Sequence, residues 1–475
     1  MTPGRKTSLV RGLGPWAAGA VTVGTMIGTG IYLKPSEMAR LAGTPDLVIL
    51  AWVVAGFLSL LGALCYAELG TAMPEAGGPY IFLRRAFGPR WGFLYGWATA
   101  WVTSPASTAS LAAGTLLFAS YFFPGLSTVL VSLEVPVPGG PWLWSITLGQ
   151  VLAAGLIGLI VLINFMRVAA VGWVGLLLTG IKVLSLAVVI GLGVVLGIRE
   201  TGPALSPVAV HQSGGLSGFL AAVVAALWAY TGWHTLLHAG GEVADPARNI
   251  PRAVIGGFLG TATLFIIFNL VCLAVLPFEQ IARSEHVASD MLLAVAGPGL
   301  AGWLTLAMII SAIGTLNSST MAGARVPFAM AREGEFFEVL GRVDSRTAVP
   351  QAAVAFQGLL APLLVLTGTF EELTALFVFA QWSFFGLSGA ALIRLRSADP
   401  DRPGVYRSRP YPLVPLLFVT LAGALAVSIL IQRPVRSGLG LLLILTGLPA
   451  WSLWTRGRKS VASSQQPPRQ IRRAG

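Results

Sequence analysis

Two short segments inside long apolar runs carry the residues best suited to hold a small ligand. The first is Gly28-Thr29-Gly30 and the second is Thr231-Gly232. Glycine lets a helix unwind or approach a neighbour closely, and a flanking threonine hydroxyl can rebond a freed peptide group. An unwound membrane helix leaves N–H and C=O groups unsatisfied, which is tolerated only beside a ligand or a polar cavity. The pattern predicts a site built from peptide groups; the alternative for either segment alone is close helix packing.

Two such interruptions would suit the head of an α-amino acid. A half-helix beginning near Ile31 would direct its N–H groups and the positive end of its dipole toward a carboxylate. Carbonyl groups released near Met26 and Trp228 would accept hydrogen bonds from an ammonium group. We therefore predict that the ligand is a zwitterion held between the two interruptions.

Three other residues have the spacing of metal ligands. His234 and His238 lie four residues apart and Glu242 follows after four more, so all three could share one face of a helix. No further Cys or His lies nearby in the sequence. We favour cavity lining or packing for this set and predict no metal or cofactor. A polytopic membrane metalloenzyme using these residues is the alternative from another functional class.

The elements that must position these residues are membrane helices. Of the 475 residues, 55% are apolar and only 11% are charged, against about a quarter in soluble proteins. Runs without Asp, Glu, Lys or Arg cover residues 12–33, 47–67, 91–133, 135–166, 201–241, 253–278, 291–324, 347–370, 373–393, 410–432 and 437–455. One further run, 168–198, is interrupted only by Lys182. Because a transmembrane helix needs roughly 20 apolar residues, we predict an all-α polytopic membrane protein with twelve transmembrane helices.

The two interruptions fall in spans 1 and 6, five spans apart. Since five is odd, the second five-span unit must enter the membrane inverted relative to the first. Interrupted helices at matching positions are typical of a transporter site between inverted repeats. We predict a first repeat over residues 12–198, a second over 201–396 and two C-terminal spans within 410–455. Residues 1–11 and 456–475 are predicted to be tails, the latter basic and disordered.

The net charge is +12, and the distribution of the Lys and Arg residues indicates the orientation of the chain in the membrane rather than nucleic acid binding. Six of the 31 Lys and Arg residues fall on one side of the predicted bilayer, two lie within spans, and the remaining 23 lie on the side of the N-terminus. Cytoplasmic loops are enriched in Lys and Arg, so we predict a cell-membrane protein with both termini in the cytoplasm. Cys65 and Cys272 lie within predicted spans and are expected to be free thiols.

Five stretches spread along the chain carry the motifs of one known family. They are VGTMIGTGIY from Val23, CYAELGTAMPEAGGPY from Cys65, LWAYTGWHTLLHAGGEVADPARNIPRAV from Leu227, SAIGTLNSSTMAGARVPFAMAREG from Ser311 and RPGVYRSRPYPLVPLLF from Arg402. Together they resemble the amino acid–polyamine–organocation (APC) transporters, and within them the L-type amino acid transporter family. The resemblance covers nearly the whole chain.

This resemblance implies a five-plus-five inverted-repeat fold (LeuT-like), with helices 1 and 6 unwound and two helices added at the C-terminus. It implies a substrate carboxylate at the backbone of span 1, an amino group near carbonyls of spans 1 and 6, and Trp228 as an aromatic gate. The expected substrate-binding residues are Thr25, Met26, Gly28, Thr29, Gly30, Trp228, Tyr230, Thr231 and Gly232.

Lys182 stands where the family has a lysine in span 5. The resemblance implies that its ammonium group replaces the sodium ion used by relatives of the same fold. It would then bridge span 1 carbonyls, near Val21 to Gly24, and the hydroxyl of Ser311 or Thr315. An ionisable group so deep in the membrane needs partners. The alternatives are a lysine that binds and releases a proton during transport, and a tether with no part in the cycle.

Departures from the family pattern refine the prediction. The loop at residues 123–142 lacks the cysteine through which animal members join a single-pass partner, so no disulfide-linked heavy chain is expected. Ser104 stands where the family commonly has arginine, which argues against an anionic substrate side chain. Thr29, Thr231 and Trp228 narrow the space beside the ligand. We predict a sodium-independent, alternating-access carrier of small neutral L-amino acids that acts as an exchanger; the alternative mechanism is proton-coupled symport.

Overall fold

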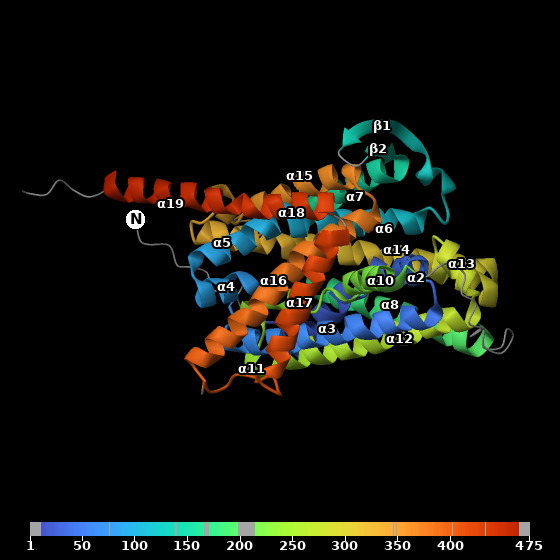
Figure 1. The fold of residues 1–475 in the computed structure, drawn as a ribbon, viewed down its shortest axis with the longest axis horizontal. Coiled ribbons are helices and arrows are strands. Elements are labelled where there is room, and N and C mark those ends of the chain that lie inside the picture. Colours follow the sequence, from blue (N-terminus) through green and yellow to red (C-terminus); the bar gives the residue numbers. More distant parts are fainter. Residues whose placement is uncertain are drawn as a thin grey trace, which may run out of the picture.

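The computed structural model describes residues 11–75, 77–137, 140–165, 171–197, 214–344, 346–347, 349–400, 402–432 and 434–464. Most of the predicted tail residues therefore lie outside the described residues. Nearly all elements are helices, and most of them run along the long axis of the molecule (Figure 1).

Nine helices within the described residues are long and apolar enough to cross a membrane, so the chain is a multi-pass membrane protein. They cover residues 15–42, 45–72, 176–197, 215–242, 246–275, 287–332, 370–398, 413–432 and 437–455. Predicted spans 3, 4 and 9 contain shorter helices. These are α5 (Pro89–Ala98) and α6 (Ser104–Ala119) with the π-helical η1 (Thr99–Thr103) between them, α7 (Leu148–Asn164) and α15 (Gln351–Thr367). The count of twelve spans and the inverted repeat stay predictions.

Both predicted interruptions are present. Two residues separate the end of helix α1 (Pro15–Met26) from the start of α2 (Thr29–Ala42), so the second half-helix begins at Thr29, two residues before the expected Ile31. Helix α10 (Gly215–Tyr230) ends in a turn that leads into the 3-10 helix η5 (Thr235–Glu242). Each interruption lies within one membrane-spanning segment, so the exposed peptide groups fall inside the bundle.

The other helices pack around these two broken spans. They are α3 (Pro45–Ala72), α4 (Pro79–Phe87), α8 (Val171–Leu192), α11 (Pro246–Pro251), α12 (Gly257–Val275), α13 (Phe278–Arg283), α14 (Val287–Arg332), α16 (Phe370–Ala398), α17 (Leu413–Gln432), α18 (Pro434–Leu445) and α19 (Gly447–Ser464). Helix α14 is kinked at Gly297, where the backbone has φ +77°.

A β-hairpin stands where the sequence predicts the start of span 4. Strand β1 (Val129–Val137) pairs antiparallel with β2 (Gly140–Thr147), and Thr147 then caps α7 through a capping box with Gln150. Span 4 therefore begins at Leu148 rather than at residue 135. The hairpin was missed because periodicity alone cannot separate a short apolar strand from a buried helix.

The hairpin and α13 lie at one end of the bundle, while α4 and α11 lie at the other end, toward which α19 extends (Figure 1). Helix α19 continues to Ser464, past the predicted end of the last span at residue 455. The first residues of the predicted C-terminal tail are therefore helical, and the assignment of this end to the cytoplasm stays a prediction.

Candidate functional site

The two interruptions are in direct contact. The Thr25 hydroxyl lies 3.0 Å from the carbonyl oxygen of Gly232 and also reaches the carbonyl of Val21 in its own helix at 2.7 Å. Gly232 has φ +137°, and a Cβ atom there would lie 2.7–2.8 Å from the backbone of Thr25 and Met26. Only glycine fits this conformation and this approach.

The start of α2 is equally constrained. A Cβ at Gly30 would lie 2.7 Å from Cα of Ala229, so this glycine permits the close approach of α2 to α10. A Cβ at Gly28 would lie 3.2 Å from the Thr315 side chain. Gly28 supplies no side-chain cap, and the first N–H groups of a helix have no partner within it. These groups are positioned to bind an anion such as a carboxylate.

A cavity of about 90 Å³ opens beside the two interruptions. Its lining includes eight of the nine predicted substrate-binding residues: Thr25, Met26, Gly28, Thr29, Gly30, Trp228, Thr231 and Gly232. Within the described residues the lining contains no Asp, Glu, Lys or Arg. The cavity is far smaller than the roughly 300–1,000 Å³ of pockets that take drug-sized ligands, so it suits a small side chain. Because its described lining carries no charged residue, that side chain is expected to be uncharged.

Tyr230 lies outside this cavity, which corrects the expectation that it contacts the substrate. Its ring stacks on Phe265 at 5.6 Å and meets Trp52 edge-on at 5.3 Å. Residues advance by about 100° along a helix, so Tyr230 points roughly away from Trp228, two positions earlier.

The Trp228 ring covers one side of the cavity. It meets the rings of Phe377 at 5.0 Å and Phe370 at 6.4 Å, both edge-on. These contacts hold the indole where an aromatic gate was predicted, although its gating role stays a prediction. The Trp228 carbonyl was expected to be free, but it accepts a hydrogen bond from the Thr231 N–H at 3.1 Å. A carbonyl oxygen has two lone pairs, so one is left for a ligand.

Lys182 is buried beside the first interruption and bridges two elements. Its Nζ donates to the carbonyl of Gly24 in α1 at 2.8 Å and to Thr315 Oγ1 in α14 at 2.5 Å. Thr315 Oγ1 also lies 3.2 Å from the Ile27 carbonyl. The expected contact of Lys182 with a span 1 carbonyl is therefore present. Of the two candidate hydroxyls in span 8, Thr315 is the one that contacts Lys182. Ser311, one turn away, has a buried hydroxyl without a hydrogen-bond partner in the described part of the chain.

This difference gives a matched pair of variants. We expect Thr315→Val to lower transport, because it removes the hydroxyl that joins Lys182 to α14 and approaches the Ile27 carbonyl. A hydrogen bond to a charged group contributes about 1.5–3 kcal/mol, so the fall should be roughly tenfold or more. Ser311→Ala removes a hydroxyl of the same helix that makes no such contact and should transport normally. Initial uptake rates in proteoliposomes, normalised to reconstituted protein, measure both; equal rates would contradict the role of Thr315.

Comparison with known proteins identifies the family. A profile of the amino acid permeases matches residues 13–449. The chain belongs to the amino acid permease family. The permease is 29% identical over 437 residues to the serine/threonine exchanger SteT of Bacillus subtilis, covering 91% of this chain and 94% of the relative. It is 28% identical to the human cystine/glutamate transporter (95% and 85%) and 28% identical to the human large neutral amino acids transporter small subunit 2 (95% and 81%).

These matches confirm the resemblance to APC transporters that include the L-type family, and they make the permease a transporter of amino acids rather than an enzyme. His234 and His238 both line the cavity, with their rings 5.6 Å apart, whereas the 3-10 helix η5 is kinked at Ala239, before it reaches Glu242. Glu242 instead pairs with Arg325 at 3.1 Å. No group of three metal-ligating side chains occurs in the described parts of the permease.

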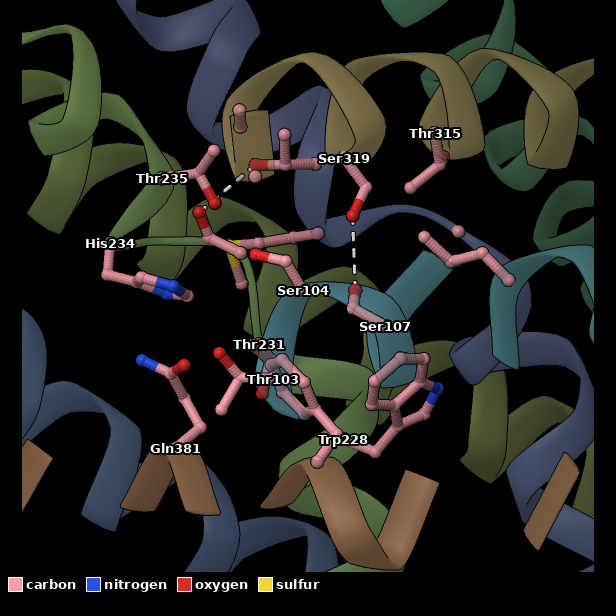
Figure 2. Close-up of a pocket in the computed structure, with 18 of the residues that line it drawn as sticks. Thr103, Ser104, Ser107, Trp228, Thr231, His234, Thr235, Thr315, Ser319 and Gln381 are labelled. Carbon is pink, nitrogen blue, oxygen red and sulfur yellow. Dashed lines mark hydrogen bonds between the residues drawn. The ribbon is translucent and has the colours of Figure 1, made fainter. Parts of the chain in front are cut away.

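The sequence analysis missed several polar residues that line the cavity of the permease. They are Tyr95, Thr99, Thr103, Ser107, Thr235, Ser319 and Gln381. Ser104, which argued against an anionic substrate, and His234 and His238, for which cavity lining was one expectation, also line the cavity. Figure 2 shows several of these side chains around the same space, and Ser107 and Ser319 lie 3.1 Å apart. A signal existed in Thr99, Thr103 and Ser107, whose spacing of four places hydroxyls on one helical face of an apolar run.

Proposed function

We propose that this permease exchanges small neutral L-amino acids across the cell membrane by alternating access, without sodium. The observation that carries the proposal is the contact between the two unwound segments beside a small cavity. The free N–H groups at the start of α2 would bind the substrate carboxylate, and carbonyls at the ends of α1 and α10 would bind its ammonium group. Trp228 would close over the bound substrate.

The preference for a neutral side chain follows from the lining of the cavity. The names of the relatives cover serine and threonine, large neutral amino acids, and the acidic amino acid glutamate, so similarity alone does not choose among them. In the described lining no charged side chain is present to pair with a charged substrate. A buried charge without a partner costs several kcal/mol, which disfavours acidic and basic amino acids.

Independence from sodium is proposed from the position of Lys182. Its ammonium group lies between a carbonyl oxygen of α1 and a hydroxyl of α14, where oxygen ligands would otherwise be free to bind a cation. A fixed positive charge there would repel sodium. The Lys and Arg bias of the loops supports cytoplasmic termini, and the absence of cysteine from residues 123–142 supports function without a disulfide-linked partner.

Counterflow in proteoliposomes tests the proposal. We expect uptake of labelled neutral amino acids to stay within about twofold when choline replaces sodium. Sodium can drive transport only if it binds the outward-open and inward-open states of the carrier with different affinity, and the proposed position of Lys182 leaves it no site. Preloading the vesicles with unlabelled neutral amino acid should raise the initial rate several-fold, whereas glutamate and lysine should compete poorly.

The same vesicles separate the alternatives. An absolute requirement for sodium would contradict the proposed role of Lys182. If labelled amino acid accumulates in vesicles that contain no amino acid, driven by a more acidic outside, the mechanism is proton-coupled symport and not exchange. Protein-free liposomes under each gradient provide the background.

A further inference from the structure

The cavity extends past the second interruption to a group of polar side chains that the proposed binding of the substrate head does not use. Trp228 precedes the interruption of α10 and His234 follows it, so the two lie on opposite sides of the unwound segment. Gln381 of α16 and Thr103 of η1 face the same space as His234 (Figure 2). The part of the cavity around His234, Gln381 and Thr103 is called the polar lobe below.

Two side chains of the polar lobe are buried and have unmet hydrogen-bonding capacity. His234 is 6% exposed and Gln381 is 3% exposed. Nδ1 of His234 and Nε2 of Gln381 form no hydrogen bond of normal geometry with the described residues, although the Gln381 side chain lies within interaction range of the Tyr95 hydroxyl. Buried polar groups in native proteins are normally satisfied, so groups of this kind beside a cavity indicate a ligand or water that completes them.

The imidazole of His234 is held in place by aromatic packing. Its ring lies 4.9 Å from the ring of Phe385 and 5.5 Å from that of Trp233, edge-on to both. It also lies 5.6 Å from the His238 ring, whose Nε2 is 3.3 Å from the Tyr95 hydroxyl. A side chain clamped in this way cannot turn to find another partner, so its polar edge is set before a ligand arrives.

The chemistry of the polar lobe selects the kind of side chain it would accept. A carboxamide and an imidazole each donate and accept hydrogen bonds. A hydroxyl or carboxamide on the substrate matches both, whereas an aliphatic side chain would leave them unpaired. Arg325, which interacts electrostatically with His238, is already paired with Glu242 at 3.1 Å and offers no partner to an ionised side chain.

Resting on the proposed function, we infer that His234 and Gln381 form a specificity subsite that reads a hydroxyl or carboxamide side chain of the substrate. The substrate head lies at the two interruptions and its side chain enters the polar lobe. Serine, threonine, asparagine and glutamine are then preferred over aliphatic amino acids of the same size.

Pairs of equal shape test this inference directly. Threonine and valine differ by a hydroxyl in place of a methyl group, and asparagine and leucine differ by a carboxamide in place of an isopropyl group. We expect the wild type to favour the polar member of at least one pair by about tenfold in kcat/KM, because a site built for hydrogen bonds rejects the analogue that leaves them unpaired. Threonine should also raise the thermal unfolding temperature of the purified protein more than valine does.

Two variants locate the subsite. Gln381→Leu removes the amide at similar volume, and His234→Phe keeps the aromatic packing but removes the ring nitrogens. In each, the polar-to-aliphatic ratio of kcat/KM should fall several-fold, mostly through KM for the polar substrate. Gln357→Leu is the matched control. Gln357 is also fully buried, with both side-chain polar atoms unpartnered in the described structure, but it does not line the cavity.

The outcomes are distinct. A ratio unchanged in both variants would overturn the subsite, as would a ratio that falls equally in Gln357→Leu. Equal stabilisation of the wild type by the two members of both pairs, threonine with valine and asparagine with leucine, would overturn it even if neither variant folds. Absence of uptake and of thermal stabilisation with every amino acid would instead reject the proposed function on which the inference rests.

Discussion

Replacing Lys182 by methionine is expected to lower exchange by roughly 10- to 150-fold while leaving the folded protein at least as stable as the wild type. Lys182 is 2% exposed, and its hydrogen-bond partners in the described structure are the neutral Gly24 carbonyl and Thr315 hydroxyl. Methionine has a similar length and no charge to desolvate. Removing a buried charge that neutral groups hold can therefore stabilise a fold. The ammonium bridge from the Gly24 carbonyl to Thr315, in contrast, is lost, and only the direct contact of the Thr315 hydroxyl with the Ile27 carbonyl still joins α14 to the end of α1.

The measurement pairs initial exchange rates with thermal unfolding in detergent. A structural tether would give the opposite result, a less stable protein with a normal rate per folded molecule. Lys34→Met is the matched control, because Lys34 is also buried at 1% exposure but pairs with Glu37 at 2.5 Å. Breaking that pair leaves a buried carboxylate uncompensated, so Lys34→Met should lose about 3–5 kcal/mol of stability.

The interruptions of spans 1 and 6 could be predicted because their signal is local. Gly28, Gly30 and Gly232 sit inside apolar runs where a continuous helix would be favoured, so a break there must have a cause. The contact of Lys182 could be anticipated because a charge in the middle of a span needs partners. The choice of Thr315 over Ser311 could not, since both lie on one face of α14 and only the axial position of α8 decides between them.

Other features depend on geometry that the sequence does not encode locally. Tyr230 was expected among the substrate-binding residues that the family resemblance implies, but the rotation of α10 turns its ring into the core against Trp52 and Phe265. Gln381 lies in α16, far along the chain from both interruptions, and only packing brings it to the cavity. The metal-like spacing of His234, His238 and Glu242 assumed an α-helix, whereas the segment after the interruption winds as a 3-10 helix.

The contact between the two interruptions makes Gly232 the most sensitive position of the site, and Gly232→Ala is expected to abolish transport and to destabilise the fold by about 2 kcal/mol or more. Two effects add. The residue has φ +137°, which L side chains rarely adopt, and the new methyl group would lie 2.7–2.8 Å from backbone atoms of Thr25 and Met26. Those atoms belong to the end of α1, which the hydroxyl of Thr25 ties to the carbonyl of Gly232 itself.

Gly297→Ala separates the two effects, because Gly297 also has a positive φ, +77°, but no atom lies within 4 Å of the position of its added Cβ. Its φ of +77° and ψ of 174° lie in a region that is essentially restricted to glycine, so it should show only the backbone cost, about 1–3 kcal/mol, with exchange largely retained. Thermal unfolding and counterflow on both variants make the comparison. If Gly232→Ala were no more harmful than Gly297→Ala, the two unwound segments could not touch as described. The peptide groups that we assign to the substrate head would then have to be found elsewhere in the bundle.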